Sequence, residues 1–520
     1  MSTELQACLP LLRTLVDTAE PDDGRWSWTG DVTGMVGGQA VRVNRRLDDS
    51  LIGGRSGIAL ALAAGARALR AAGIRPADPW RIPPDELASQ VARDCLERVS
   101  RIAPATRGVP IAPATPVTPD VPVRSHHSHD SHGSAPTERL GVITGVAMTA
   151  RLLEDDALTA AARSCAGTAV RGLAADPQDV PQTPDLFGGT AGQLLEVLGA
   201  ELPSEVEELR RTVADTLSAR LMADAVRDAL GTRWNSRGAG GPVVGLAHGA
   251  SGPALALAEW AAFAARQAAE GDQRGDQGDQ GEGEDGSPGK ADGGGGGTHS
   301  GDGGADGRGG GAGGGTHSGG GDPDRIGAAW STVLDAMRWE SAWYDEQLRQ
   351  WRDPRGTQEP ISWWCHGAAG LGIAAARIRR LATARGRPEV AQLASVVLRR
   401  ALRATALTWS APVPITMDGR IDGTLCHGLA GAVESVQVAA ALTGDPTGEH
   451  TRAARCLARP LLRPGIDGRA WSCGAIGGGR SPSLFTGLSG VVVTLVRLHD
   501  RRLAPSPALP GPVFGAGGVD

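Results

Sequence analysis

Apolar residues recur along most of the chain at the three- and four-residue spacing of helices that face a core. Clear examples lie at 58–69 (IALALAAGARAL), 254–269 (ALALAEWAAFAARQAA) and 371–381 (LGIAAARIRRL). Each stretch is therefore predicted to form an amphipathic helix. Strand-like alternation of apolar and polar residues is scarce, and Val/Ile runs bounded by turn residues are few. The pattern predicts an all-α protein.

A turn of the form G-x-x-G, followed by an apolar helix, is repeated along the chain. The copies are GRSG at 54–57, GTAG at 189–192, GASG at 249–252, GAAG at 367–370, GLAG at 428–431 and GLSG at 487–490, with a degenerate copy at Gly145 where Met148 replaces the second glycine. Apart from two low-complexity stretches the spacing is mostly about 60 residues, enough for two helices and their connections. Such pairs could stack as an open solenoid or close into a ring. Closure is favoured, because glycine turns that permit positive φ and close approach of neighbouring segments would then converge on one rim.

The two low-complexity stretches are predicted to be linkers inserted into a single domain that spans residues 1–520. The first, 102–136, is rich in proline and histidine, and its histidines are interpreted as part of a polar linker. The second, 271–322, holds 25 glycines and a net charge of −7. Neither composition can bury enough apolar area to offset the entropy of ordering it, so both are expected to be solvated or disordered.

Charge and cysteine usage narrow the functional classes. Outside the glycine-rich stretch the chain is near neutral, with no stripe of lysine or arginine, which excludes nucleic acid as an electrostatic partner. Neither a signal peptide nor a transmembrane helix is predicted. Seven cysteines, an odd number spread over a long chain, disfavour a disulfide framework. We therefore expect a cytoplasmic protein whose clustered cysteines are ligands or nucleophiles.

Three copies of the turn carry candidate chemistry: GLAHGASG, SWWCHGAAG and TLCHGLAG. A histidine precedes the first glycine in each, and two copies place a cysteine before that histidine; these residues are His248, Cys365, His366, Cys426 and His427. Equivalent positions of a ring of repeats lie on the same rim, so these side chains are expected to meet. Thiol and imidazole ligands suit Zn²⁺ rather than Mg²⁺ or Ca²⁺. Two geometries stay open: a closed Cys2His2 structural site that includes His366, or three ligands with an open fourth position.

These motifs, together with LFTGLSG near the end of the chain, resemble the lanthionine synthetase C-like proteins, the cyclases of lanthipeptide biosynthesis. The resemblance implies a double α/α toroid of seven inner and seven outer helices, with zinc at the glycine-rich rim. It implies that Cys365, Cys426 and His427 are the zinc ligands. It further implies that His248 is the catalytic acid/base, assisted by Asp185 of DLFGGTAG. Asp185 has an alternative interpretation as a helix N-cap, and His248 as a turn histidine bonded to a backbone carbonyl.

The implied reaction is addition of a peptide cysteine thiol to a dehydroalanine or dehydrobutyrine of the same peptide, which closes a thioether ring. The partners would be a dehydrated precursor peptide and a separate dehydratase. The alternatives are zinc-dependent addition of another thiol, such as glutathione, to dehydroamino acids, or a non-catalytic toroid that binds peptide. Prenyl transfer is disfavoured because its metal set includes a carboxylate that these motifs lack.

Two positions depart from the family pattern. Many members have an arginine a few residues before the first zinc cysteine, whereas here residues 359–362 are EPIS and the nearest arginines are Arg355 and Arg352. His366 stands where several cyclases have tyrosine. It is left with two roles, either as a supporting group beside the ligands or as an additional proton donor. Cys473 is interpreted as a packing residue, and the tryptophans 363 and 364 as core residues or as the lining of a peptide cleft.

Overall fold

The computed structural model describes residues 1–36, 39–75, 78–101, 136–176, 183–235, 241–278, 322–356, 362–410, 419–462, 471–473, 475 and 478–509. The α-helices are α1 (Thr3–Asp17), α2 (Arg55–Ala71), α3 (Pro84–Arg101), α4 (Pro136–Leu153), α5 (Asp156–Ala175), α6 (Thr190–Gly199), α7 (Glu207–Ala223), α8 (Ser251–Gly278), α9 (Pro323–Ala342), α10 (Ala368–Ala384), α11 (Pro388–Ser410), α12 (Leu429–Thr443), α13 (Glu449–Leu457) and α14 (Leu488–His499). Within the described residues, short 3₁₀ helices are η2 (Ser204–Val206), η3 (Arg459–Leu462) and η4 (Arg501–Leu503).

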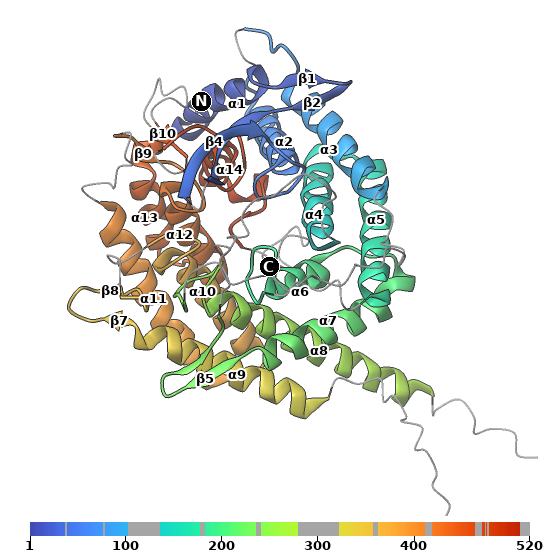
Figure 1. Ribbon diagram of the computed structural model, residues 1–520, viewed down its shortest axis with the longest axis vertical. Coiled ribbons are helices and arrows are strands. Elements are labelled where there is room, and N and C mark those ends of the chain that lie inside the picture. The colour runs from blue at the N-terminus through green and yellow to red at the C-terminus, as the bar shows by residue number, and fades with distance from the viewer. Residues whose placement is uncertain are drawn as a thin grey trace, which may run out of the picture.

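The helices form two concentric rings (Figure 1). Each even-numbered helix from α2 to α12 contacts the next even-numbered one, and α14 contacts α2, which closes the inner ring. Each odd-numbered helix from α3 to α13 packs outside the even-numbered helix that precedes it, and α1 packs on α14. The two ends of the chain thus supply the last pair, where Ser2 Oγ and His499 Nδ1 lie 3.1 Å apart. The predicted toroid of seven inner and seven outer helices is confirmed for the residues that the structure describes.

The position of a helix in the rings follows from its sequence. Inner helices are apolar and small on every side: α2 (RSGIALALAAGARALRA) buries nearly all of its residues, as α12 does. Outer helices are amphipathic, and α3 buries only the face that carries Leu87, Val91 and Leu96 among others. Small residues allow close packing between the rings, as at Gly65, where a methyl group would lie 2.5 Å from Leu12.

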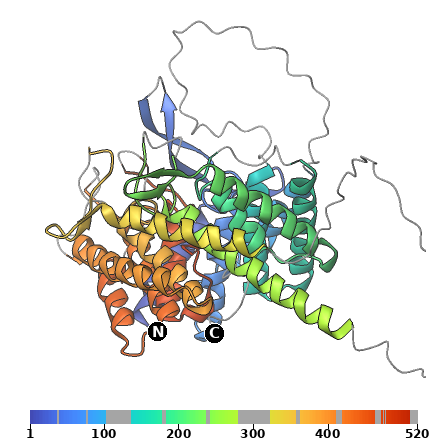
Figure 2. The same cartoon turned by 90° about the horizontal axis from the view of Figure 1, so that it is seen from below.

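The strands are short and lie in connections that lead from an outer helix to the next inner one. They are β1 (Glu20–Asp22), β2 (Arg25–Ser27), β3 (Thr29–Val36), β4 (Gln39–Arg46), β5 (Val226–Asp228), β6 (Gly231–Arg233), β7 (Tyr344–Asp345), β8 (Gln350–Trp351), β9 (Ile421–Asp422) and β10 (Trp471–Ser472). They pair two by two, antiparallel except for β9 with β10. The hairpin β3–β4 stands out from one end of the molecule (Figure 2). Within the described residues, no helix is long and apolar enough to cross a membrane.

The predicted linkers fall largely on undescribed residues. Of the stretch 102–136 only Pro136 is described, as the first residue of α4, and the histidines of that stretch lie outside the description. Helix α8 continues to Gly278, and so includes the beginning of the stretch 271–322; residues 279–321 lie outside the description.

Candidate metal centre and its surroundings

Six inner helices begin at the G-x-x-G turns. The first glycine is the N-cap of α2, α6, α10, α12 and α14, and α8 starts two residues after Gly249. A methyl group on the second glycine of any of the six turns would lie only 1.9 to 2.4 Å from the carbonyl oxygen six residues earlier. Of the five N-cap glycines only Gly367 has a positive φ, of 92°, while the others are extended. The motif is therefore explained mainly by close approach of the backbone at the second glycine, and a positive φ is required at the N-cap glycine of only one turn.

The degenerate copy at Gly145 is not a turn, and this part of the prediction is wrong. Gly145 lies inside α4, and a methyl group there would meet Ser56 Oγ and Leu51 Cδ1 at 3.0 Å. The glycine therefore lets an inner helix pack closely against the start of its neighbour α2, which requires the same small size without a change of direction.

Backbone hydrogen bonds join the turns into a continuous rim. In most turns the residue two positions before the first glycine donates its N–H to the equivalent carbonyl of another turn: Ala247 to Cys365 (3.1 Å), Cys365 to Cys426 (3.3 Å), Cys426 to Phe485 (2.9 Å) and Phe485 to Ile52 (3.0 Å). The turn at Gly189 joins the rim one residue out of register, through a bond of 3.0 Å from Leu186 to Ala247. The register of the repeat therefore sets Cys365 beside Cys426, although they are distant in the chain.

Cys365, Cys426 and His427 form a cluster at this rim. Their candidate ligand atoms all lie within 4.8 Å of one another, and both cysteines are buried. Cys426 Sγ is 3.5 Å from His427 Nε2, and the N–H of His427 bonds to Thr424 Oγ1 at 3.3 Å. Among the described residues no other such group of three or more histidine, cysteine or acidic side chains occurs. His366 is not a member of the cluster.

The electrostatics of the cluster favour one thiolate and one imidazolium. Burial raises the pKa of the Cys365 thiol. This effect is outweighed by a hydrogen bond with Cys426, by the charge of His427 and by hydrogen bonds with His366 and His427, so the pKa of Cys365 lies well below its ordinary value. The hydrogen bond to Cys365, with burial, keeps the pKa of Cys426 well above that value. Burial lowers the pKa of His427, but the negative Cys365 raises it to about 9. Two thiolates could coexist here only with a cation, which is the state that a Zn²⁺ ligand set requires.

His248 lies beside the cluster and is paired with Asp185. Nδ1 of His248 is 3.2 Å from Oδ2 of Asp185, with the two side chains 23% and 11% exposed. Burial lowers the pKa of His248, but the hydrogen bond and charge of Asp185, with a contribution from Cys365, raise it above the ordinary value. His366 stacks on His248 with ring centroids 5.0 Å apart, and its buried Nε2 has no hydrogen-bond partner. The pair His248–Asp185 thus has the composition of a general acid held in place by a carboxylate.

The two tryptophans before Cys365 have different environments. Trp363 is 36% exposed and stands edge-on to His427, with centroids 5.2 Å apart. Trp364 is 1% exposed and packs between Phe187 and Phe485, at 5.1 and 4.8 Å. One tryptophan is therefore partly exposed beside the cluster, and the other belongs to the core. Sequence reasoning missed Phe187 and Phe485, although both stand two positions before the first glycine of their turns, as the cysteines do.

The two arginines upstream of Cys365 are already engaged in ion pairs. Arg355 binds Asp353 at 2.6 Å, and Arg352 binds Asp345. Residues 357–361 lie outside the description, so how residues 359–361, part of the stretch that departs from the family pattern, approach the cluster is not described.

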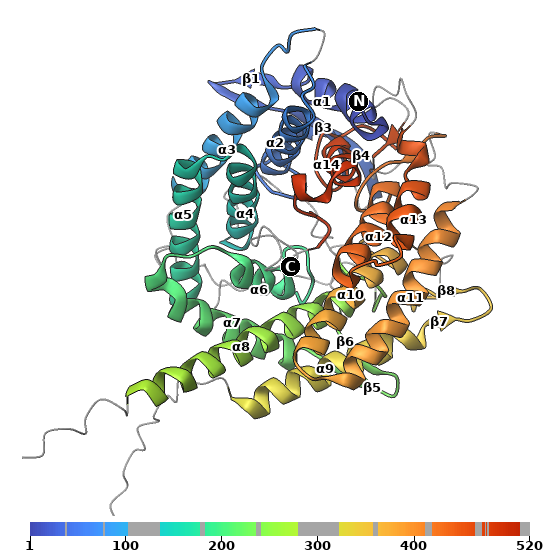
Figure 3. The same ribbon diagram turned by 180° about the vertical axis from the view of Figure 1, so that it is seen from behind.

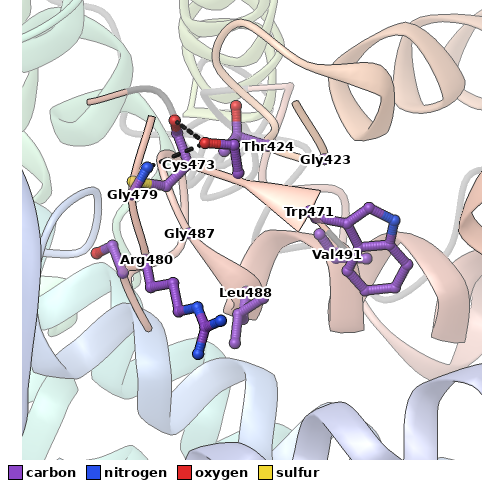
Figure 4. A pocket seen from close by; sticks show the side chains of 11 residues that line it. Gly423, Thr424, Trp471, Cys473, Gly479, Arg480, Gly487, Leu488 and Val491 are labelled. Carbon is purple, nitrogen blue, oxygen red and sulfur yellow. Dashed lines mark hydrogen bonds between the residues drawn. The ribbon is translucent and has the colours of Figure 1, made fainter. Parts of the chain in front are cut away.

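Cys473 lies in a separate small pocket, close to the same turn. Thr424, Trp471 and Arg480 line this pocket with it (Figure 4). The pocket has a volume of about 10 Å³, room for no more than about one water molecule. The Sγ of Cys473 is 3.8 Å from the carbonyl oxygen of Asp31 in β3, and burial raises its pKa to about 11. A buried, protonated thiol outside the cluster is what a packing residue should be.

A buried carboxyl group that belongs to no sequence motif anchors the turn of His248. Glu340 of α9 is 2% exposed, and its Oε1 accepts hydrogen bonds from the N–H of Gly245 (3.3 Å), the N–H of Ser251 (2.9 Å) and Ser251 Oγ (3.0 Å). The other oxygen, Oε2, is buried without a partner, and burial raises the pKa of Glu340 to about 8. Sequence alone could not reveal this contact, because α9 carries no G-x-x-G turn.

Comparison with protein families places part of this architecture. Residues 329–510 match the family described as Lanthionine synthetase C-like protein. This region of the chain is similar to that family. Comparison with curated proteins gives no match. The matching region contains Cys365, His366, Cys426 and His427, whereas Asp185 and His248 precede it. The resemblance inferred from the motifs is confirmed over that region, and it supports a lanthionine-synthetase-type function in broad terms.

Proposed function

We propose that the protein is a zinc-dependent lanthipeptide cyclase, acting on a peptide that a separate enzyme has dehydrated. The observation that carries the proposal is the convergence of two thiols and an imidazole within 4.8 Å, beside a paired histidine and aspartate, on the rim of an α/α toroid. Cys365, Cys426 and His427 would hold the ion. His366 stacks on His248 and stands outside the cluster, which favours three protein ligands with an open fourth position over the closed Cys2His2 site.

Zinc, when bound, supplies the positive charge that lowers the pKa of a peptide cysteine thiol. Without that charge, only a few per cent of the thiol is ionised to thiolate at neutral pH. The sulfur of that cysteine forms a bond to the β-carbon of the dehydroamino acid, the carbon–carbon double bond is lost, and the α-carbon takes a proton. His248 is the group that would deliver this proton, because Asp185 orients its ring and raises its pKa. The proton gained balances the one lost from the thiol, so the peptide mass does not change.

The aromatic side chains around the cluster indicate how the peptide substrate would be bound. Trp363, exposed beside His427, would contact the peptide, while Trp364 is buried against Phe187 and would pack behind Cys365. The exposure of Trp363 beside His427 favours approach of the peptide from the solvent-facing side of the rim. A cysteine and a dehydroamino acid of the same peptide could then reach His248 together.

The direct test counts thiols. The zinc-loaded protein is incubated with a dehydrated, cysteine-containing precursor peptide, and the free thiols are then alkylated and counted by mass spectrometry. Loss of peptide thiols at constant mass supports the cyclase. Persistence of every thiol of the cognate peptide refutes it. A mass gain that appears only with added glutathione identifies the alternative thiol addition, and peptide binding without any reaction identifies the non-catalytic toroid.

The ligand assignment is tested by metal analysis. Cys365→Ala and Cys426→Ala are each expected to lose stoichiometric zinc, because two protein ligands hold the ion far more weakly than three. Cys8→Ala is the matched control, since Cys8 is an equally buried thiol on α1, outside the cluster. Retention of stoichiometric zinc in both cluster variants contradicts the assignment. His366→Phe should keep its zinc, and a marked loss would support the closed site instead.

A further inference from the structure

The segment that follows α14 turns back into the ring. In Figures 1 and 3 the red trace after α14 runs inward toward the middle of the toroid. Ala504, Ala508 and Leu509 are buried, at 3%, 0% and 4% exposure. Nothing in the repeat requires such a segment, because the seventh helix pair is already completed by α14 with α1.

A buried ion pair holds the first part of this segment. Arg497 of α14 and Glu434 of α12 lie 3.0 Å apart and are almost fully buried. Arg497 donates to the carbonyl of Ala504 at 2.7 Å, and Ser506 Oγ donates to Glu434 Oε2 at 2.7 Å. The segment thereby satisfies polar groups of both charged side chains, which removes part of the cost of burying the pair. Its path through the ring is therefore fixed.

The end of the segment reaches the residue that precedes the first cysteine of the cluster. The indole Nε1–H of Trp364 donates to the carbonyl of Ala508 at 2.8 Å, and both groups are buried. The N–H groups of Trp364 and Cys365 both point to the carbonyl of Cys426, at 3.1 and 3.3 Å. Trp364 is thus held through its backbone by the second cysteine turn and through its ring by the segment 504–509.

We propose that the segment 504–509 is a positioning element of the metal centre. By fixing the ring of Trp364 it fixes the backbone of Cys365, and so the place of one sulfur relative to Cys426 and His427. The inference rests on the proposed function for its metal readout. Its physical basis is that a ligand set bound in its final geometry loses little entropy when the ion arrives, so supporting hydrogen bonds raise metal affinity.

The test removes one hydrogen bond and little else. Trp364→Phe keeps an aromatic ring against Phe187 and Phe485 but loses the N–H that Ala508 accepts. Trp234→Phe is the matched control, because Trp234 is 2% exposed and donates an equivalent bond of 2.7 Å to the carbonyl of Leu221, at the outer helix α7. Zinc affinity is measured on the full chain by competition with a chromogenic chelator. The loss of a buried hydrogen bond predicts that Trp364→Phe raises the zinc dissociation constant about three- to tenfold. The control Trp234→Phe should leave the zinc dissociation constant unchanged.

A second readout does not depend on metal. In zinc-free protein, the rates at which Cys365 and Cys426 react with a thiol reagent, read by peptide mass spectrometry, should rise in Trp364→Phe and stay unchanged in Trp234→Phe. A chain that ends at Pro507, which loses Ala508 but keeps Ser506, should behave like Trp364→Phe, whereas a chain that ends at Leu509 should behave like the wild type. The proposal is overturned if Trp364→Phe matches Trp234→Phe in both readouts. Absence of zinc binding by the wild type would instead refute the proposed function, and the thiol rates would still decide the positioning role.

Discussion

Replacing the second glycine of the first cysteine turn should lower the stability of the fold and weaken the proposed metal centre. A methyl group on Gly370 would lie 2.0 Å from the carbonyl oxygen of Trp364 and 2.7 Å from Leu246 Cβ, whereas ordinary contact begins at 3.4 Å. Relief therefore needs a backbone movement of roughly 1.4 Å. Both sides resist it, because the N–H of Gly370 bonds to the carbonyl of Trp363 at 3.2 Å and the rim bonds hold the preceding residues. Gly370→Ala is expected to lower the free energy of unfolding by about 3 kcal/mol, the upper end for overpacking.

The matched control has the opposite sign. Gly327 lies within α9, and a methyl group there meets nothing within 4 Å. Gly327→Ala should raise the free energy of unfolding by roughly 0.5–1 kcal/mol, because alanine costs less entropy in a helix than glycine. Both variants are followed by circular dichroism in urea, and zinc affinity is measured alongside. A displacement of Trp364 would also displace Cys365, the next residue. Gly370→Ala should therefore bind zinc more weakly, whereas Gly327→Ala should bind zinc as the wild type does. If Gly370→Ala is as stable as wild type, the close-approach explanation of the motif is refuted.

Two further predictions concern titration. Asp185 raises the pKa of His248, so Asp185→Asn should lower that pKa. The high-pH limb of the kcat/KM profile should then shift to lower pH, because His248 loses its proton at a lower pH in the variant. A limb that does not move would exclude His248 as the proton donor. Burial raises the pKa of Glu340 to about 8 from an ordinary 4.5, so its contribution to stability is present below about 4.5 and is lost as pH rises through about 8. Glu340→Gln keeps a hydrogen-bond acceptor but cannot ionise, so it should reduce the loss of unfolding free energy at high pH by up to about 5 kcal/mol. Urea unfolding of both proteins at pH 5 and pH 9 measures this loss. An equal pH dependence of the variant and the wild type would contradict the assignment.

The helices and the site positions were accessible from sequence because both depend on local pattern and repetition. The stretches around Ile58, Ala254 and Leu371 lie in α2, α8 and α10, as their spacing predicted. The cysteine and histidine positions followed from one register of the repeated turn, and the rim hydrogen bonds preserve that register. The same register also marks Phe187 and Phe485, so a stricter use of the repeat would have placed them beside the cysteines.

Where local pattern has two structural uses, the sequence was ambiguous. A glycine in an apolar stretch serves equally as a turn and as a close contact between helices, and Gly145 proved to be the second. For the same reason positive φ was expected at the turns, although the backbone is mostly extended there and glycine is required by a carbonyl six residues away.

By itself the sequence determined an all-α chain, a repeated glycine turn and the residues at equivalent positions of that turn, because short-range spacing and repetition encode these directly. The tertiary structure alone decided which distant groups support that rim. Glu340 beneath the turn of His248 and the carbonyl of Ala508 against Trp364 belong to no motif, since a buried carboxylate or a backbone carbonyl acquires its partner only when the rings close. The division of roles between Trp363 and Trp364 has the same origin, for adjacent residues with the same side chain differ only in which side of the turn faces the core.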